Sequence, residues 1–165
     1  MISISIKNQQ ELVVPDFAAL KAAATLVLEG EGVSSGKVTV ALFDDATIHA
    51  LNKRHLGHDE PTDVLCFAYS EPKARKVEAD MAVGAGVAKA AADERGHDVQ
   101  AELCLYVIHG CLHLRGYEDK TDAGAAEMRR KEGIYLKKLG LPAIAGDSPT
   151  TGSEAGATRP SEDSD

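Results

Sequence analysis

The segment from Asp98 to Gly116, DVQAELCLYVIHGCLHLRG, is the part of the chain that most restricts its fold. Its large apolar side chains recur at helical spacing: Leu103, Val107, Ile108, Leu112 and Leu114. This pattern predicts a helix that is buried on most of its circumference. Asp98 is a suitable N-cap, and Gly116 is a suitable stop. The other elements of the chain therefore have to cover this helix.

The rest of the chain mixes strand and helix patterns. Alternating apolar and polar residues, or short β-branched runs, predict strands over residues 2–7, 37–43, 62–69 and 77–83. Ala- and Leu-rich or amphipathic segments with capping residues predict helices over residues 16–32, 44–57, 86–96 and 122–140. This mixture predicts a single α+β domain, with one mixed sheet of about four strands packed by helices.

The bulk properties fit a soluble domain. A length of 165 residues is enough to bury a core without disulfides. The three cysteines are odd in number and form no CxxC pair, which argues against a disulfide framework. The N-terminus shows no signal peptide, and no apolar stretch approaches the roughly 18 residues that span a membrane. We therefore expect a cytoplasmic protein without a membrane partner.

Charge is distributed unevenly along the chain. The net charge is −8, and residues 145–165 contribute five acids against one arginine. That segment is rich in Gly, Ser, Thr and Pro, and it contains almost no large apolar residue. We predict a folded domain over residues 1–144 and a disordered acidic tail over 145–165. The acidic body argues against binding nucleic acid by bulk attraction, but it permits a local basic groove.

Two histidines near the end of the buried helix are candidate metal ligands. His109 and His113 are four residues apart, so their rings project from one face and can share one Zn²⁺. A turn at Gly116 would bring the carboxylates of Glu118 and Asp119 back toward the same ion, and a carboxylate is an acceptable zinc ligand. The same spacing also occurs on helices that bind no metal. Gly110 inside the helix favours a close approach by a backbone or a substrate.

These residues carry a family resemblance. HGCLHLRGYED resembles the signature H-G-x-L-H-L-x-G-Y-D-H of the YbeY family of bacterial rRNA maturation factors, and seven of the first eight fixed positions match. Upstream, LNKRHLGHDEPTDVLCF resembles the family's L-N-x-x-Y-R-x-x-D-x-P-T-D-V-L-S-F. EADMAV retains Asp80 of G-D-I-x-I, and AELCLYVIHG keeps the acid at Glu102. The resemblance covers roughly residues 35–140 in three blocks.

The resemblance implies a zinc-dependent, single-strand-specific endoribonuclease with a zincin-like metal helix. It implies a role at the 3′ end of the small-subunit rRNA and in ribosome quality control. One Zn²⁺ would be held by His109 and His113, with Asp119 at the position of the family's third histidine. The family's arginine falls on Leu56, and Cys66 replaces a serine. We expect metal binding to be retained, with an altered metal preference.

Phosphodiester cleavage also needs an acid or base and cations for the phosphates. Asp63 and Glu102 are the candidate acids, and Arg115 is the candidate phosphate contact beside the ligands. Each has a structural alternative: a turn or cap for Asp63, a hydrogen bond for Glu102, and a helix C-terminal cation for Arg115. Further candidates are the acids Asp80 and Glu118 and the cations Lys53, Arg54, Lys73, Arg75 and Lys76.

Two other functions stay open at this point. One is a zincin-like metallopeptidase, although Gly110 stands where HExxH enzymes carry their general base. The other is a non-catalytic ribosome-assembly factor that docks on ribosomal proteins or assembly GTPases. The expected partner in the preferred interpretation is rRNA on the small ribosomal subunit. Nothing in the sequence predicts the oligomeric state.

Overall fold

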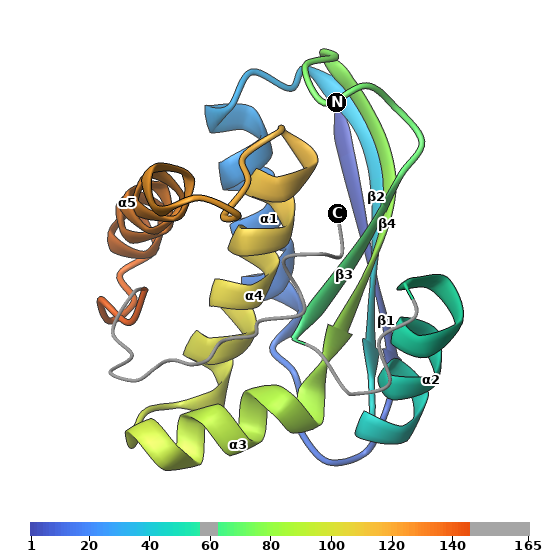
Figure 1. Ribbon diagram of the computed structural model, residues 1–165, viewed down its shortest axis with the longest axis vertical. Helices are drawn as coiled ribbons and strands as arrows, with labels where there is room; N and C mark the ends of the chain where they lie inside the picture. Colours follow the sequence, from blue (N-terminus) through green and yellow to red (C-terminus); the bar gives the residue numbers. More distant parts are fainter. Residues whose placement is uncertain (57–62, 146–165) are drawn as a thin grey trace.

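A four-stranded mixed sheet forms the frame of the domain (Figure 1). The computed structural model describes residues 1–56 and 63–145. The strands are β1 (Ile2–Gln9), β2 (Ser35–Phe43), β3 (Val64–Ala68) and β4 (Lys76–Gly84), in the spatial order β1-β2-β4-β3. β2 runs parallel to both β1 and β4, whereas β3 pairs antiparallel with β4. The predicted α+β class and four-stranded mixed sheet are confirmed.

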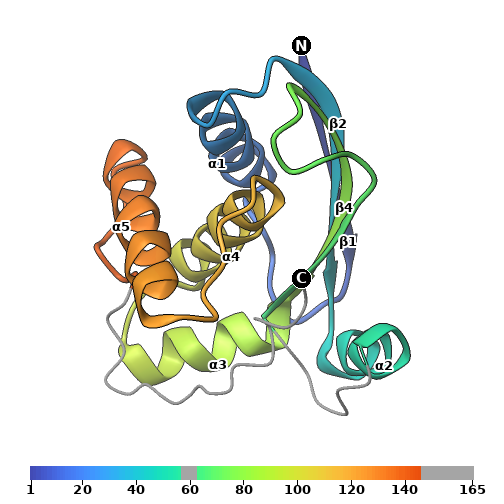
Figure 2. The same cartoon turned by 45° about the horizontal axis from the view of Figure 1, so that its top comes forward.

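Most of the helices lie on one side of this sheet (Figures 1 and 2). That side holds α1 (Phe17–Gly30), α3 (Ala85–Arg95), α4 (Val99–Leu114) and α5 (Asp122–Lys138). The helix α2 (Asp45–Leu56) lies on the other side. Helix α4 packs against α1, α3, α5 and the strands β3 and β4. It is therefore the central element of the helical layer.

The ends of the helices follow local chemistry. The Asp16 side chain caps α1 by accepting from the Ala19 backbone N–H at 3.0 Å, and Asp98 caps α4 by accepting from Gln100 at 3.0 Å. Gly96, with φ of 75°, ends α3 in the left-handed conformation that glycine adopts without strain. These contacts satisfy backbone groups that the first and last turns of a helix leave unpaired.

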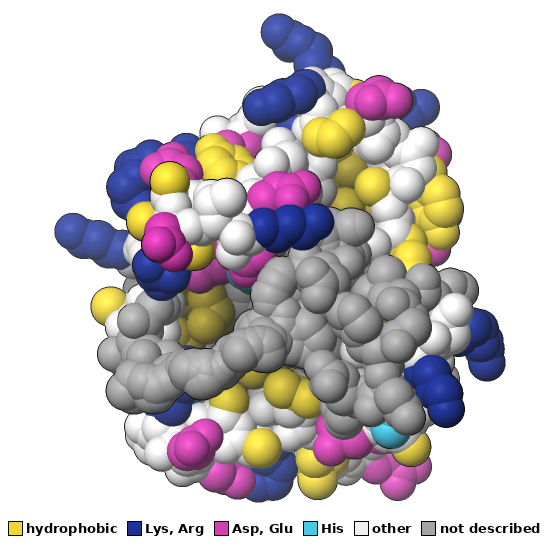
Figure 3. Space-filling view, in the orientation of Figure 1, with side chains coloured by type: hydrophobic (Ala, Val, Ile, Leu, Met, Phe, Trp, Pro, Cys, Tyr) yellow, Lys and Arg dark blue, Asp and Glu magenta, His cyan; other side chains and the backbone are white. Residues whose placement is uncertain are grey.

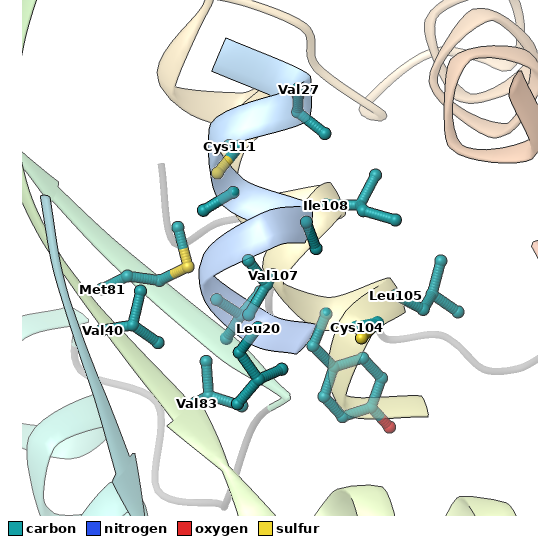
Figure 4. Close-up of a cluster of buried hydrophobic side chains, with 14 of the residues drawn as sticks. Leu20, Val27, Val40, Met81, Val83, Cys104, Leu105, Val107, Ile108 and Cys111 are labelled. Atoms are coloured by element: carbon teal, nitrogen blue, oxygen red, sulfur yellow. The ribbon is translucent and has the colours of Figure 1, made fainter. Parts of the chain in front are cut away.

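The buried character of α4 is confirmed. Leu103, Ile108 and Leu112 are 0% exposed. Figure 4 shows side chains of α4 packed against α1 and against Met81 and Val83 of β4. Full burial of a leucine or isoleucine side chain stabilises a fold by about 2 kcal/mol. The helix that carries the two histidines is thus held rigidly from several directions.

The sheet has two faces of different character. Along β4, Val77 and Met81 are buried toward the helices, whereas Glu78 and Asp80 are exposed on the opposite face. Helix α2 covers part of that opposite face, with a small apolar cluster around Ile48, Leu65 and Ala82. Because side chains alternate along a strand, this register decides which strand residues can reach α4.

The C-terminal limit of the described domain lies beyond the last helix. Ile144 is 4% exposed and joins the main core. The predicted tail from residue 146 onward lies outside the described residues, as does the segment 57–62 with His58. No helix in the described part of the chain is both long enough and apolar enough to cross a membrane.

Candidate metal centre

The two candidate ligands lie at the only incompletely buried positions in the second half of α4. From Ala101 to Arg115 every residue is buried except His109 and His113. The His109 side chain is 17% exposed. The helix therefore reaches solvent here only through its two imidazoles, which face one side because they are one turn apart.

A buried carboxylate fixes the orientation of the His109 ring. The Nδ1 atom of His109 lies 2.5 Å from Oε2 of Glu132, a residue of α5 whose side chain is 7% exposed. An ionised carboxylate can only accept a hydrogen bond, so the Nδ1–H of the ring donates. This arrangement assigns metal coordination to Nε2, and a carboxylate partner raises the basicity of a ligating imidazole.

A backbone carbonyl performs the same task for His113. Its Nδ1 atom lies 3.2 Å from the carbonyl oxygen of Tyr117, which can only accept a hydrogen bond. Tyr117 reaches this position because Gly116 turns the chain back with φ of 98°. Both rings therefore carry their hydrogen on Nδ1, and both would bind an ion through Nε2.

The same turn brings Asp119 toward the histidines. Its Oδ2 atom lies 3.9 Å from Nε2 of His109. Two ligands of a tetrahedral zinc ion lie about 3.4 Å apart, so this pair is slightly wider than a closed site. Among residues 1–56 and 63–145, no three His, Cys, Asp or Glu side chains converge tightly enough to bind an ion. Two imidazoles and one carboxylate are nevertheless donor types that zinc sites in proteins use.

The two rings differ in their protonation. Burial by itself lowers the pKa of His109, but the Glu132 carboxylate, with Asp63 and Asp119, raises it to about 9. Burial lowers the pKa of His113, and the neighbouring His109 lowers it further. Near neutral pH the metal-free pair therefore carries one positive charge, which a divalent cation would replace.

The residues between the ligands serve packing. A Cβ atom on Gly110 would lie 2.7 Å from Sδ of Met81 and 3.2 Å from Cγ2 of Val64, so the glycine allows α4 to approach β3 and β4 closely. Cys111 is 0% exposed, and burial raises the pKa of its thiol to about 12. Cys111 therefore faces the core, as the helical spacing predicts, and its thiol is unsuited to act as a nucleophile.

Two of the candidate acids, Asp63 and Glu118, act electrostatically on the histidines. Asp63 precedes β3, its Oδ1 accepts from the Val64 backbone N–H at 2.8 Å, and its charge contributes to the raised pKa of His109. The charge of Glu118 opposes the lowering of the pKa of His113. Asp80 projects from the opposite face of the sheet, where its carboxylate accepts from the Tyr69 hydroxyl at 2.8 Å. Asp80 therefore lies on the face of the sheet away from α4, although it belongs to a family motif.

The structure places Glu102 in a hydrogen-bond network away from the two imidazoles. Glu102 is 1% exposed, and its Oε1 atom lies 2.5 Å from Nε2 of His97. Its second oxygen lies 3.7 Å from Arg95 at the end of α3. These contacts link α3 to α4. They correspond to the structural hydrogen bond that was the alternative to a catalytic role for Glu102.

Arg115 is also engaged within the fold. It is 7% exposed, and its guanidinium donates to the carbonyl oxygens of Ala74 at 2.6 Å and Glu31 at 3.3 Å. Ala74 lies in the loop between β3 and β4, so Arg115 fastens that loop to the end of α4. This geometry does not favour Arg115 as a phosphate contact.

Sequence reasoning missed the groups that orient the two rings. Glu132 belongs to the buried set of α5, together with Met128, Tyr135 and Leu136. An acid on the inner face of an amphipathic helix was the available signal, because such an acid needs a partner. The carbonyl of Tyr117 left no signal, since any residue at that position carries one.

Comparisons with known proteins identify a family that the chain matches. A family model described as "Endoribonuclease YbeY" matches residues 4–140. The chain is similar to "Endoribonuclease YbeY" of Moorella thermoacetica, with 37% identity, covering 83% of this chain and 97% of the relative. The chain is also similar to the protein of the same name from Pelotomaculum thermopropionicum, with 38% identity, covering 84% of this chain and 97% of the relative.

A solved structure also resembles the fold. The solution structure of TM1509 from Thermotoga maritima superposes with a TM-score of 0.58 at 26% identity. The match covers 96% of this chain and all of the other chain.

Proposed function

The chain belongs to the YbeY family of endoribonucleases, hydrolases that act on RNA, and on this basis we propose that it cleaves single-stranded rRNA with one bound zinc ion. The proposed substrate is precursor rRNA of the small subunit, near its 3′ end, during maturation and quality control of ribosomes. Ribosomal proteins or assembly GTPases are the partners that such a role requires.

One observation supports the metal assignment above the others. Both imidazoles are held with Nδ1–H donating, to Glu132 and to the carbonyl of Tyr117, so both are prepared to coordinate through Nε2. Two histidines that met by chance would not be expected to share this arrangement. Three protein ligands, with Asp119 as the third, also leave one place of a tetrahedral ion open for catalysis.

His109, His113 and Asp119 would hold a divalent ion, which would supply Lewis-acid chemistry for a phosphoryl group and help to activate a nucleophile at neutral pH. The protein's own residues supply orientation and proton transfer. We assign proton transfer to Asp63, because it is the candidate acid whose charge acts on His109. Glu102 is assigned instead to the packing of α3 on α4.

The phosphate contacts are assigned to the loop between β3 and β4. Lys73 and Arg75 in this loop are exposed, and Arg115 holds the loop through Ala74 at the end of α4. Lys and Arg side chains gather at the end of the molecule where this loop lies (Figures 1 and 3). A local cluster of cations can grip RNA phosphates although the net charge of the chain is −8.

The geometry gives a peptidase less support. The residue after the first histidine is Gly110, whose Cα faces Met81 and Val64. A carboxylate at that position would collide with the sheet, so the general base of HExxH peptidases has no counterpart here.

Metal analysis combined with two cleavage assays tests the proposal. Purified wild-type protein should contain about one zinc per chain and should cut single-stranded RNA, but not casein. His113→Ala should lose both the metal and RNA cleavage. His49→Ala provides a matched control, because His49 lies on α2 across the sheet, and it should retain both properties.

Other outcomes would redirect the assignment. Casein cleavage that depends on His113 would establish a peptidase instead. Cosedimentation with small ribosomal subunits, without turnover of RNA and without bound metal, would establish an assembly factor that does not catalyse.

A further inference from the structure

A partly buried carboxylate at the end of α1 accepts hydrogen bonds from two other segments. Glu31 has a side chain that is 9% exposed. Its Oε1 accepts from the hydroxyl of Tyr117 at 2.9 Å, and its Oε2 accepts from the hydroxyl of Tyr135 at 2.5 Å and from Nζ of Lys131 at 3.1 Å. Figures 1 and 2 show that α1 and α4 end at the same end of the helical layer.

The first connection leads to His113. Two polar groups of Tyr117 make the connection: its hydroxyl donates to Glu31, and its carbonyl accepts from Nδ1 of His113. Gly116 adopts the left-handed conformation, and the N–H groups of Gly116 and Tyr117 close the turn by donating to the carbonyls of His113 and Leu112. The hydroxyl contact with Glu31 restrains Tyr117 in addition, from the end of its side chain. The contact with Glu31 therefore limits how far the carbonyl that orients His113 can move.

The second connection leads to His109. Lys131 and Tyr135 of α5 stand on either side of Glu132, whose carboxylate accepts from Nδ1 of His109. By binding both neighbours, Glu31 fixes the rotation of α5 at the turn that presents Glu132. The amine of Lys131 also lies 5.8 Å from the ring centre of Tyr117, so the two connections meet.

We propose that Glu31 is a positioning residue of the metal centre, because one carboxylate holds in place both groups that orient the two imidazoles. This inference rests on the proposed function and extends it to a residue outside the signature. Burial of a carboxylate is unfavourable unless its oxygens are satisfied, and here three donors satisfy them.

Two variants separate positioning from simple structural support. Glu31→Gln keeps the size of the side chain, but it replaces the oxygens that accept from two segments with a single acceptor. Tyr117→Phe removes only the connection toward His113 and leaves the ring in place. Glu127→Gln is the control, because Glu127 is an exposed acid of α5 that pairs with Arg130.

Zinc affinity of the folded proteins is the first measurement, made by competition with a chromophoric chelator well below the melting temperature. Loss of a group that supports a ligand typically weakens metal affinity about 10- to 100-fold. We expect about a tenfold loss for Glu31→Gln and for Tyr117→Phe, and no change for Glu127→Gln. The double variant should bind zinc with an affinity within about twofold of that of Glu31→Gln. Both changes break the same hydrogen bond between Tyr117 and Glu31, so their effects should not add.

Ring N–H resonances of the metal-free protein are the second measurement. Nitrogen-15 spectra should show protected Nδ1–H signals for His109 and His113 in the wild type, and both signals should broaden or vanish in Glu31→Gln. A lower melting temperature with unchanged zinc affinity and intact ring signals would overturn the assignment of Glu31. Wild-type protein that shows the ring signals but neither binds zinc nor cuts RNA would refute the proposed function. The ring signals of Glu31→Gln would then decide alone whether Glu31 orients the two imidazoles: their loss would support this role, and intact signals would overturn it.

Discussion

At the scale of single residues, the site is defined by the hydrogen-bond partner of the Nδ1 atom of each imidazole. A histidine binds a metal well when one ring nitrogen is held as a donor and the other is directed at the ion. Glu132 provides this constraint for His109, and the carbonyl of Tyr117 provides it for His113. Glu132 accepts with its side chain and Tyr117 with its backbone, so a substitution at position 132 removes the acceptor, whereas a substitution at position 117 can only displace it.

The role assigned to Asp63 is tested by the substitution Asp63→Asn. The amide cannot take up a proton at neutral pH, so kcat for RNA cleavage should fall about 100-fold or more, while zinc content stays at the wild-type level. Steady-state cleavage of a fluorescent single-stranded RNA gives kcat, and elemental analysis gives the metal content.

Asp80→Asn is the control for this experiment, since Asp80 lies on the opposite face of the sheet and contacts Tyr69. It should cleave RNA at the wild-type rate. Equal losses in the two variants, or wild-type turnover by Asp63→Asn, would remove Asp63 from the mechanism.

At the scale of secondary-structure elements, the centre is assembled from pieces that are far apart in the chain. Helix α4 supplies the two imidazoles, α5 supplies Glu132, and the end of α1 supplies Glu31. The loop between β3 and β4 joins them because Arg115 donates to Ala74. The elements around α4 therefore act together, and changes far from the ligands should alter how the site works.

The cations of the β3–β4 loop give a prediction about RNA binding. Replacing both Lys73 and Arg75 by alanine should weaken binding of single-stranded RNA, and it should reduce the slope of log affinity against log salt by about 1.4. Fluorescence anisotropy at several salt concentrations provides the measurement. Alanine at Lys21 and Lys89, on the surfaces of α1 and α3, should leave the slope unchanged.

Glu31 gives a prediction about stability and pH. Burial by itself raises the pKa of its carboxyl, but donors from Tyr135, Tyr117 and Lys131 outweigh burial and hold the pKa below its usual value. A depressed pKa in the folded state stabilises the protein above the unfolded pKa of about 4.3, and this stabilisation disappears as the pH falls through the folded value.

The experiment compares unfolding of the wild type with that of Glu31→Gln. At pH 7 the variant should lose about 2 kcal/mol of unfolding free energy, the usual effect of hydrogen bonds to a charged group. The difference should persist down to about pH 5 and shrink below about pH 4. Urea titrations between pH 7 and pH 3 provide the values, and a gap that stays the same at pH 3 would contradict the assignment.

At the scale of the whole molecule, the acidic chain does not present one uniform field. Acidic and basic side chains are interspersed on the face shown in Figure 3. Five of the acids fall within residues 145–165, which the composition predicts to be a disordered tail. Among the described residues, Ile144 is the core residue nearest to the C-terminus, and it is 4% exposed.

Deletion of residues 146–165 tests this boundary. The truncated protein should melt within a few degrees of the full chain, because no core residue is removed. Its RNA affinity should stay the same or rise slightly, since the deletion removes negative charge. Thermal denaturation followed by circular dichroism supplies the first value. A fall of more than about ten degrees would show that the tail belongs to the folded unit.

The sequence by itself determined the class of the fold and the nature of the site. Periodicity, capping residues and glycines placed the strands and helices correctly, because these are local properties of the chain. The two histidines on α4 were also visible, since a helix places residues four apart on one face.

Only the tertiary structure shows which partners the polar residues around this site have. In the sequence, Asp63, Asp80, Glu102 and Arg115 were candidates that each had a structural alternative. The alternation of β4 put Asp80 on the far face, and packing of α3 engaged Glu102. Glu132 and Glu31 act on ligands 23 and 82 residues away from them in the chain. Contacts between such distant segments depend on how the helices pack, and helix packing leaves no local pattern in the sequence.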